Sequence, residues 1–281
     1  MKFTKMQGLG NDYVYINCFE EKVQDPAKLS VMVSDRHFGI GSDGLVLILP
    51  GDAADFRMRM FNADGSEAQM CGNAARCVGR YVYERGLTKK TELTLETGSG
   101  IRSIKLNVTD GKVNSVAVEM GVPELRPYAV PVKLPGERAV SVPLEVCGIS
   151  MRMTCVSMGN PHAVIFVEDA DSFPVAQIGT VIENLDIFPE RTNVEFVTVF
   201  GKNDLRMRVW ERGSGETMAC GTGACATLAA AVLNGLSDRK AAVRLNGGTL
   251  NVMWPENDAG VIQEGTAEFV FDGDLILPEQ R

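Results

Sequence analysis

The sequence alternates between short apolar, β-branched stretches and segments rich in glycine, proline, aspartate or asparagine. Stretches of the first kind are typical of β-strands, and the residues between them are typical of turns. We predict strands over residues 13–16, 45–49, 56–61, 92–96, 101–108 and 113–120 in the first half, and over 145–156, 163–167, 194–199, 205–210, 241–245 and 249–253 in the second. The fold is therefore expected to consist mainly of β-sheet.

Each half also contains one segment with the features of a central helix. Residues 73–85 carry apolar side chains at helical spacing and are followed by Gly86, a common helix stop. Residues 222–234 are rich in alanine and leucine and precede Gly235. Because this second segment is apolar on nearly all sides, we expect it to be buried inside a cup of strands. Shorter helices are predicted from Pro26 toward Arg36 and from Phe173 toward Asn184.

A block of sequence recurs at an offset of 149 residues. Arg-Met-Arg-Met-Phe at residues 57–61 returns as Arg-Met-Arg-Val-Trp at residues 206–210. The same offset joins further equivalent positions without a gap: Gly10-Asn11 to Gly159-Asn160, Glu67 to Glu216, Cys71 to Cys220, Gly72 to Gly221 and Ala75 to Ala224. One offset that joins several separate blocks indicates a duplicated unit and not chance similarity.

The duplication and the predicted elements together indicate an α+β fold. We expect two homologous domains related by a pseudo-two-fold axis, each a curved, mostly antiparallel sheet wrapped around a central helix. The predicted domains are residues 1–121 and 122–267, and a C-terminal strand at 268–281 is a candidate to complete the first domain. A length of 281 residues agrees with about two domains.

Composition narrows the classes of partner. The chain is 45% apolar and carries a formal net charge of −8, with no basic block. We therefore expect no binding to nucleic acid or to anionic membranes, and no apolar run approaches the roughly 20 residues of a membrane helix. The N-terminal segment lacks the apolar region of a secretion signal, so we expect a cytoplasmic protein. A homodimer remains open.

Seven cysteines provide the candidate chemistry, and an odd number in a non-secreted chain favours reduced thiols. The spacings Cys71-x5-Cys77 and Cys220-x4-Cys225 differ from the usual zinc pattern, so we expect no metal site. We assign Cys18, Cys147, Cys155, Cys77 and Cys225 to packing. Only Cys71 and Cys220 share the repeat offset, a following glycine and a position at the start of a predicted helix.

Two thiols on opposite sides of a small molecule suit racemisation or epimerisation. One group removes a proton from a carbon centre, and the other returns a proton on the opposite face. We expect the helix N-terminus to lower the pKa of each cysteine from about 8.5, which would give a thiolate base and a thiol acid. The backbone N–H groups of Gly72-Asn73 and Gly221-Thr222 could bind a carboxylate next to the reacting carbon.

Several motifs resemble those of the diaminopimelate epimerase family. The long segment Asn62-Ala-Asp-Gly-Ser-Glu-Ala-Gln-Met-Cys71-Gly-Asn-Ala-Ala-Arg-Cys77 matches the family signature. Further matches are Gly8–Asp12, Met158–His162, Thr192–Phe196, Glu211–Gly213 and Ala219–Ala224, in the same order along nearly the whole chain. The resemblance implies interconversion of LL- and meso-2,6-diaminopimelate without a cofactor, a late step toward lysine and the peptidoglycan cross-link.

The resemblance also implies roles for individual residues. Cys71 and Cys220 would be the acid/base thiols, and His162 and Glu211 would tune the pKa values of these thiols. The substrate carboxylate at the reacting carbon would bind at Gly72, Asn73, Gly221 and Thr222, and its ammonium would meet Glu211 and the backbone of Arg212. The Arg212 guanidinium, Asn62, Asn160 and Asn193 would hold the distal end, and Asn11 would line the pocket. Gly44 is a lesser candidate, since it stands where some members have a substrate-contacting glutamine.

Other classes of protein share part of this sequence pattern. Gly221–Ala226 satisfies the letters of a nucleotide-binding glycine motif, but a polar segment precedes it where an apolar strand is required. Proline-type racemases also use two cysteines, and phenazine-biosynthesis isomerases share the duplicated architecture, but both differ in their flanking motifs. No lysine site for pyridoxal phosphate is evident. A binding module without catalysis would leave the two aligned cysteines unexplained.

Overall fold

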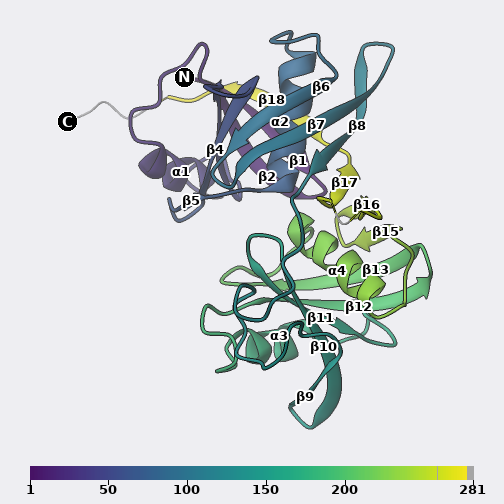
Figure 1. The fold of residues 1–281 in the computed structure, drawn as a ribbon. Coiled ribbons are helices and arrows are strands. Elements are labelled where there is room, and N and C mark those ends of the chain that lie inside the picture. The colour runs from purple at the N-terminus through teal and green to yellow at the C-terminus, as the bar shows by residue number, and fades with distance from the viewer. Residues whose placement is uncertain (258, 277–281) are drawn as a thin grey trace. The chain divides into compact units, whose positions relative to one another are not determined.

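The computed structural model describes residues 1–257 and 259–276, and the chain divides into two compact units. Unit 1 is formed by Met1–Val118 together with the C-terminal segment from Gly265, and unit 2 is formed by Glu119–Glu264. The predicted α+β fold with a sheet and a central helix in each half is confirmed (Figure 1). The part of the predicted strand at residues 277–281 lies outside the described residues.

Unit 1 contains nine strands and two helices among its described residues. The strands are β1 Lys2–Gly8, β2 Asn11–Asn17, β3 Gly44–Pro50, β4 Phe56–Asn62, β5 Glu67–Ala68, β6 Glu92–Thr97, β7 Gly100–Thr109, β8 Lys112–Glu119 and β18 Glu268–Asp274. The helices are α1 Pro26–Ser34 and α2 Gly72–Glu84. The C-terminal strand β18 pairs antiparallel with β1 and thereby adds to the sheet of this unit.

Unit 2 repeats this set of elements. Its strands are β9 Val142–Val146, β10 Ile149–Ser157, β11 Pro161–Phe166, β12 Asn193–Gly201, β13 Asp204–Glu211, β14 Gly215–Glu216, β15 Lys240–Leu245, β16 Gly248–Met253 and β17 Ile262–Gly265. Its helices are α3 Val175–Glu183 and α4 Gly221–Leu233.

The two sheets have the same order of strand directions. In unit 1 the pairs β18–β1, β1–β2, β3–β4, β6–β7 and β7–β8 are antiparallel, whereas β2–β3 and β4–β6 are parallel. In unit 2 the corresponding pairs β9–β10, β10–β11, β12–β13, β15–β16 and β16–β17 are antiparallel, whereas β11–β12 and β13–β15 are parallel. The parallel pairs therefore occur at equivalent places in both units.

The central helices α2 and α4 match the predicted segments to within one residue at each end. Helix α2 packs against β1, β4 and β7, and α4 packs against six strands of unit 2. Nearly every side chain of α4 is buried, as its all-round apolar sequence predicted. Both helices end in the same way, with a glycine of positive φ, Gly86 or Gly235, after the last turn.

The outer faces of the two sheets carry the remaining helices. In unit 1, α1 packs on β3 and β4 over a core that includes Val14, Ile16 and Leu45. In unit 2, α3 packs on β12 and β13 over a core that includes Ile165 and Phe196. Each sheet is therefore packed against a helix on each of its two faces.

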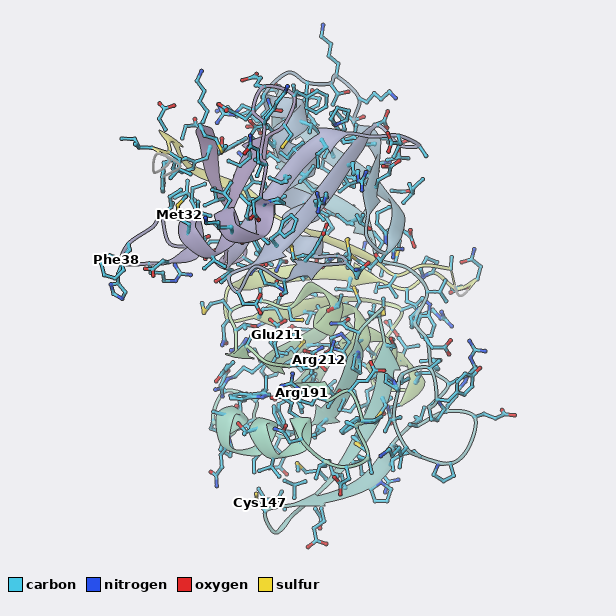
Figure 2. All side chains as sticks on the ribbon, turned by 90° about the vertical axis from the view of Figure 1, so that its left-hand side faces the viewer. Met32, Phe38, Cys147, Arg191, Glu211 and Arg212 are labelled. Atoms are coloured by element: carbon cyan, nitrogen blue, oxygen red, sulfur yellow. The ribbon has the colours of Figure 1, made fainter. Side chains whose placement is uncertain are left out.

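One strand prediction was wrong. Residues 145–156 form two strands and not one, because Cys147 and Gly148 both adopt positive φ (53° and 76°) and turn the chain back between β9 and β10. The turn also exposes Cys147 at the hairpin tip, so its assignment to packing was wrong (Figure 2). The packing assignments of Cys77, Cys155 and Cys225 are confirmed by their burial, and Cys18 is half-buried.

Strand β1 was missed. Its apolar residues Phe3 and Met6 are not separated by an even number of positions, because the register shifts between Lys5 and Met6. Lys5 is also buried, where its ammonium pairs with Asp12 and the Gly41 carbonyl oxygen. A bulge and a buried charge both remove the simple alternation that sequence analysis relies on.

No helix of the described residues is long and apolar enough to cross a membrane. Within residues 1–257 and 259–276, no disulfide bond joins two of the cysteines.

Candidate functional site

Cys71 and Cys220 occupy the same structural position in their units. Each is the N-cap residue of its central helix, with extended backbone torsions just before the first helical turn. The Cys71 sulfur accepts a hydrogen bond from the Ala74 N–H at 3.5 Å, and the Cys220 sulfur accepts one from the Gly223 N–H at 3.4 Å. Serine and aspartate are the usual residues at this position, because a side-chain acceptor satisfies an otherwise unpaired N–H group. A cysteine sulfur performs that role here.

In unit 1, Cys71 is linked to a group of residues that we call the Asn11 network: Arg76, Asn73, Asn11 and Asp43. The Arg76 guanidinium donates to Asn73 Oδ1 at 2.8 Å, and Asn73 Nδ2 donates to Asn11 Oδ1 at 3.2 Å. Asn11 Nδ2 donates in turn to Asp43 Oδ2 at 2.8 Å. The Cys71 thiol donates to Asn11 Oδ1, with sulfur and oxygen 3.6 Å apart.

The direction of hydrogen bonds in the Asn11 network follows from chemistry alone. A guanidinium only donates and a carboxylate only accepts, so the two asparagine amides between Arg76 and Asp43 can be oriented in one way. Asn11 therefore presents its carbonyl oxygen, an acceptor, to Cys71.

In unit 2, Cys220 is linked to a different group, which we call the Asn160 network: Glu195, His162, Asn160 and Thr222. Glu195 Oε1 lies 2.7 Å from His162 Nδ1, and His162 Nε2 lies 3.0 Å from Asn160 Oδ1. Asn160 Nδ2 donates to Thr222 Oγ1 at 3.3 Å, and the Thr222 hydroxyl lies 3.5 Å from the Cys220 sulfur. Both His162 and Glu195 are 0% exposed.

The pKa of Cys220 is raised well above the ordinary value, mainly because the thiol is buried. The carboxylates of Glu211 and Glu195 raise it further, while hydrogen bonds from Thr222 and the Gly223 N–H oppose the shift. The lowered pKa that we expected for Cys220 from its place at a helix N-terminus is therefore wrong, because desolvation and two carboxylates outweigh the helix end. Cys220 rests as a thiol.

Glu211 ends strand β13, and its carboxylate faces Cys220. Burial raises the pKa of Glu211, whereas hydrogen bonds from Thr217 and the Cys220 thiol and the nearby His162 lower it. A carboxylate that accepts a hydrogen bond from a thiol can influence when that thiol releases its proton. The geometry thus joins Glu211 and Cys220 directly, while His162 connects to Cys220 through Asn160 and Thr222.

Several other predicted residues are already engaged within their own unit. Both ends of the Asn193 amide are occupied, since Nδ2 donates to the Pro161 carbonyl and Oδ1 accepts from the Arg212 N–H at 2.8 Å. The Arg212 guanidinium donates to the Glu190 carbonyl oxygen. Figure 2 places Glu211, Arg212 and Arg191 close together in unit 2. Asn193 therefore holds the backbone of Arg212 in place.

In unit 1, Asn62 ends strand β4 and its Nδ2 donates to the Ser66 hydroxyl at 3.0 Å. Gly44 begins β3 beside Tyr13 and Asn62 in the strand register. A Cβ at residue 44 would lie 2.1 Å from the Phe61 carbonyl oxygen and 2.9 Å from the Tyr13 ring. No side chain, glutamine included, fits there without movement of the backbone, which explains the glycine by packing.

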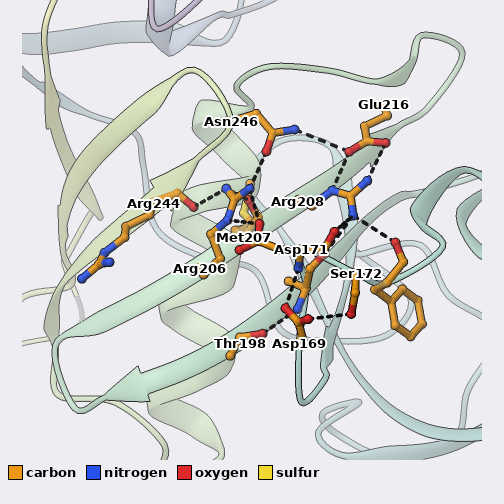
Figure 3. A network of polar contacts seen from close by, with 12 residues as sticks. Asp169, Asp171, Ser172, Thr198, Arg206, Met207, Arg208, Glu216, Arg244 and Asn246 are labelled. Atoms are coloured by element: carbon orange, nitrogen blue, oxygen red, sulfur yellow. Dashed lines mark hydrogen bonds and ion pairs between the residues drawn. The ribbon is translucent and has the colours of Figure 1, made fainter.

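An arginine–glutamate pair braces the segment that leads to each cysteine. Arg59 and Glu67 join β4 to β5 through two hydrogen bonds of 2.7 and 2.9 Å, and Arg208 and Glu216 join β13 to β14 through two of 2.7 and 3.0 Å. Arg208 and Glu216 follow Arg59 and Glu67, respectively, by 149 residues, which is the offset of the repeat. Arg208 also donates to three backbone carbonyls of residues 170–173, so the unit 2 pair lies within a larger polar network (Figure 3).

Asp43, Arg76 and Glu195 were not predicted from the sequence as residues near the cysteines. Glu195 gives the clearest signal that could have been used, because it is an ionisable residue inside the apolar strand at 194–199. The described residues include no group of three or more histidine, cysteine, aspartate or glutamate side chains arranged to hold a metal ion.

Comparison with known proteins shows the family to which the chain belongs. A sequence model of the family described as diaminopimelate epimerase matches residues 3–126 and 154–270. The chain is 56% identical over 279 residues to the diaminopimelate epimerase of Acetivibrio thermocellus, covering 99% of this chain and 100% of that protein.

Solved structures with low sequence identity share the fold. A phenazine biosynthesis protein of the PhzF family from Bacillus anthracis superimposes with a TM-score of 0.73 at 18% identity, with 99% of each chain covered. A hydroxyproline epimerase from Agrobacterium vitis gives a TM-score of 0.72 at 15% identity, covering 97% of this chain and 91% of that one. At such identities the likeness concerns the fold alone.

Proposed function

The chain belongs to the diaminopimelate epimerase family, and from this premise we propose that it interconverts LL- and meso-2,6-diaminopimelate with Cys71 and Cys220 as the two acid/base groups. The reaction needs no cofactor in this proposal, since both proton transfers are made by side chains. The observation that supports it most is the placement of both cysteines as N-caps of equivalent helices.

The proposed reaction moves one proton at each face of the α-carbon. A thiolate removes the α-proton, so a C–H bond breaks and an S–H bond forms, and the electron pair is delocalised into the adjacent carboxylate. The opposite thiol then gives its proton to the carbon, so that its S–H bond breaks and a C–H bond forms with inverted configuration. The enzyme ends with the thiolate on the other sulfur, and the reverse reaction uses the same groups.

The starts of α2 and α4 supply electrostatic support for the intermediate. The N–H groups of Gly72 and Asn73 and those of Gly221 and Thr222 lie in the first helical turns, where partial positive charge accumulates. In the proposal they bind the carboxylate next to the reacting carbon. Negative charge grows on this carboxylate as the proton leaves, so the helix ends stabilise the transition state more than the substrate.

The polar residues around Glu211 suit the remaining charges of the substrate. We assign the ammonium at the reacting centre to the Glu211 carboxylate and the Arg212 backbone, and the distal carboxylate to the Arg212 guanidinium, which can bind it through two hydrogen bonds. Asn62 and Asn160 complete the distal subsite, and Asn11 lines the pocket. Asn193 acts in part through Arg212, because its amide holds the Arg212 N–H.

The two cysteines are unequal in this scheme. Because burial and two carboxylates raise the pKa of Cys220, we assign it as the proton donor in the resting enzyme. Glu211 accepts a hydrogen bond from the Cys220 thiol. In the proposal, Glu211 and His162 are the groups that adjust the pKa of Cys220. The proposal also places the protein in the cytoplasm, where its cysteines remain reduced.

Incubation of the purified protein with LL-diaminopimelate in deuterated water, without added cofactor, tests the proposal. We expect the meso isomer to appear with one deuterium at the inverted carbon, while early substrate stays unlabelled. The donor thiol carries deuterium from the solvent, whereas the acceptor thiol holds the proton taken from the substrate and can return only that proton. Proline and hydroxyproline serve as control substrates. Absence of meso product, or turnover of proline instead, would overturn the assignment.

A further inference from the structure

The Glu195 carboxylate is a buried charge for which the proposed reaction has no direct use. It is 0% exposed and lies on β12, an otherwise apolar strand. Oε1 contacts His162 Nδ1 at 2.7 Å, and Oε2 has no hydrogen-bond partner among the described residues. A buried carboxylate with an unsatisfied oxygen costs free energy, so its presence calls for a reason other than stability.

The structure leaves space for this carboxylate at the start of α4. A Cβ at Gly223 would lie 2.7 Å from Glu195 Oε1 and 3.2 Å from the Cys220 sulfur. Glycine at position 223 therefore lets the carboxylate and the sulfur share one side of the first helical turn. Glu195 and Cys220 are close enough for the carboxylate to raise the pKa of the thiol.

The orientation of the Asn160 amide depends on the protonation of His162. With Nδ2 of Asn160 toward Thr222, its Oδ1 faces His162 Nε2, and this contact is a hydrogen bond only if Nε2 carries a proton. His162 Nδ1 must also carry a proton to bond with the Glu195 carboxylate. This orientation of the Asn160 amide therefore calls for a proton on each ring nitrogen of His162, and the Glu195 carboxylate is the acceptor for the proton on Nδ1.

We propose that Glu195 is a positioning residue for the epimerase reaction: by holding His162 doubly protonated, it fixes the Asn160 amide and thereby the Thr222 hydroxyl beside Cys220. With the Asn160 amide in this orientation, Thr222 Oγ1 accepts from Asn160 and keeps its own proton for the Cys220 sulfur. A neutral His162 would require the Asn160 NH₂ at Nε2. The Asn160 oxygen would then draw the Thr222 proton away from Cys220.

The effect of Glu195 on catalysis rests on the proposed function, whereas its effect on the His162 ring can be measured independently of that function. The decisive measurement is a long-range ¹⁵N–¹H spectrum of the histidine rings, which is readable because the chain has two histidines, and the exposed His37 is an internal reference. If the proposal holds, both ring nitrogens of His162 carry a proton in the unaltered protein. In Glu195→Gln one of them should be lost.

Kinetics of the same variant give the second measurement. We expect kcat of Glu195→Gln to fall by about tenfold to a hundredfold, as is usual when a reacting group is displaced, with a changed pH profile. Glu195→Asp keeps the charge but shortens its reach, and should recover part of the loss. Glu183→Gln is the matched control, because Glu183 is a buried carboxylate of unit 2 that bonds Trp210 and Arg191 and not His162.

Two results would overturn the proposal. One is a His162 ring in Glu195→Gln with the same protons as in the unaltered protein. The other is a Glu195→Gln variant with unchanged kcat and pH profile whose only defect is a lower melting temperature, as expected for Glu183→Gln. If the unaltered protein shows no epimerase activity, the proposed function fails, while the His162 spectra still decide whether Glu195 controls the ring.

Discussion

Unit 1 and unit 2 hold equivalent cysteines at the start of equivalent helices, yet the polar residues behind each cysteine have opposite polarity. In unit 1 the Asn11 network runs from the Arg76 guanidinium to the Asp43 carboxylate, and Asn11 shows Cys71 an acceptor. In unit 2 the Asn160 network starts at the Glu195 carboxylate, and Asn160 turns its donor toward Thr222 and Cys220. Asn11 and Asn160 occupy the same position of the repeat. Asn11 directs its amide oxygen toward Cys71, whereas Asn160 directs its amide nitrogen toward Thr222, which contacts Cys220.

The difference shows which features a duplicated fold keeps. Strand directions and helix caps are the same in both units, because they depend on backbone pairing. The ionisable residues differ: the positions of His162 and Glu195 in unit 2 are occupied by Tyr13 and Val46 in unit 1, and the position of Arg76 is occupied by Cys225. Two similar frames thus give two thiols with different surroundings, as a reaction with one donor and one acceptor requires.

Removal of either thiol should have the largest effect and tests whether both units take part. We expect Cys71→Ala and Cys220→Ala each to lower kcat/KM by at least about a hundredfold, the usual contribution of general acid or base catalysis. Cys147→Ala, which removes the exposed thiol of the β9–β10 hairpin, is the control and should keep full activity. Retained activity in either Cys71→Ala or Cys220→Ala would show that one unit works alone.

Removal of the Glu211 carboxylate should have an intermediate effect and sharpen the contrast at Cys220. Glu211 raises the pKa of Cys220 by charge repulsion, and the Glu211 carboxylate accepts a hydrogen bond from the Cys220 thiol. In Glu211→Gln we therefore expect iodoacetamide to alkylate Cys220 at lower pH than in the unaltered protein, as followed residue by residue with mass spectrometry. The exposed Cys147 is the internal reference, and Glu183→Gln is the control variant. An unchanged pH dependence would mean that burial alone sets the acidity of Cys220.

Removal of a core thiol should have the smallest effect and compares the interiors of the two units. Burial raises the pKa of Cys77 in unit 1 to about 11 and that of Cys155 in unit 2 to about 12. Below about pH 8.5, the ordinary pKa of cysteine, both thiols hold their proton in the folded and in the unfolded state, so they add nothing to the pH dependence of stability. At higher pH the unfolded chain loses the proton first, and the free energy of unfolding falls by up to about 1.4 kcal/mol per pH unit for each thiol.

Cys77→Ala and Cys155→Ala should each make this alkaline loss of stability less steep. Urea unfolding at pH 8, 9 and 10 measures it, with Cys147→Ala as the control that removes an exposed thiol. A slope that stays the same in both variants would contradict the role of burial in raising these pKa values.

Much of the fold follows from the order of residues along the chain. The repeat at 57–61 and 206–210, the helices at 73–85 and 222–234 and the special status of Cys71 and Cys220 depend on local periodicity and on an internal comparison, both of which are present in the sequence. Strand β1 and the β9–β10 turn were not found, because a bulge, the buried Lys5 and the positive φ of Cys147 depend on partners elsewhere in the unit.

The sequence alone determined that two equivalent cysteines begin two equivalent helices, because helix caps and repeats are local features. Only the tertiary structure decided what each cysteine meets: Asp43 reaches Asn11 from 32 residues away, and Glu195 reaches His162 from 33. Burial and charge at a point in space depend on every segment packed around it, and for this reason the direction of the pKa shift at Cys220 was reversed from the one expected at a helix N-terminus.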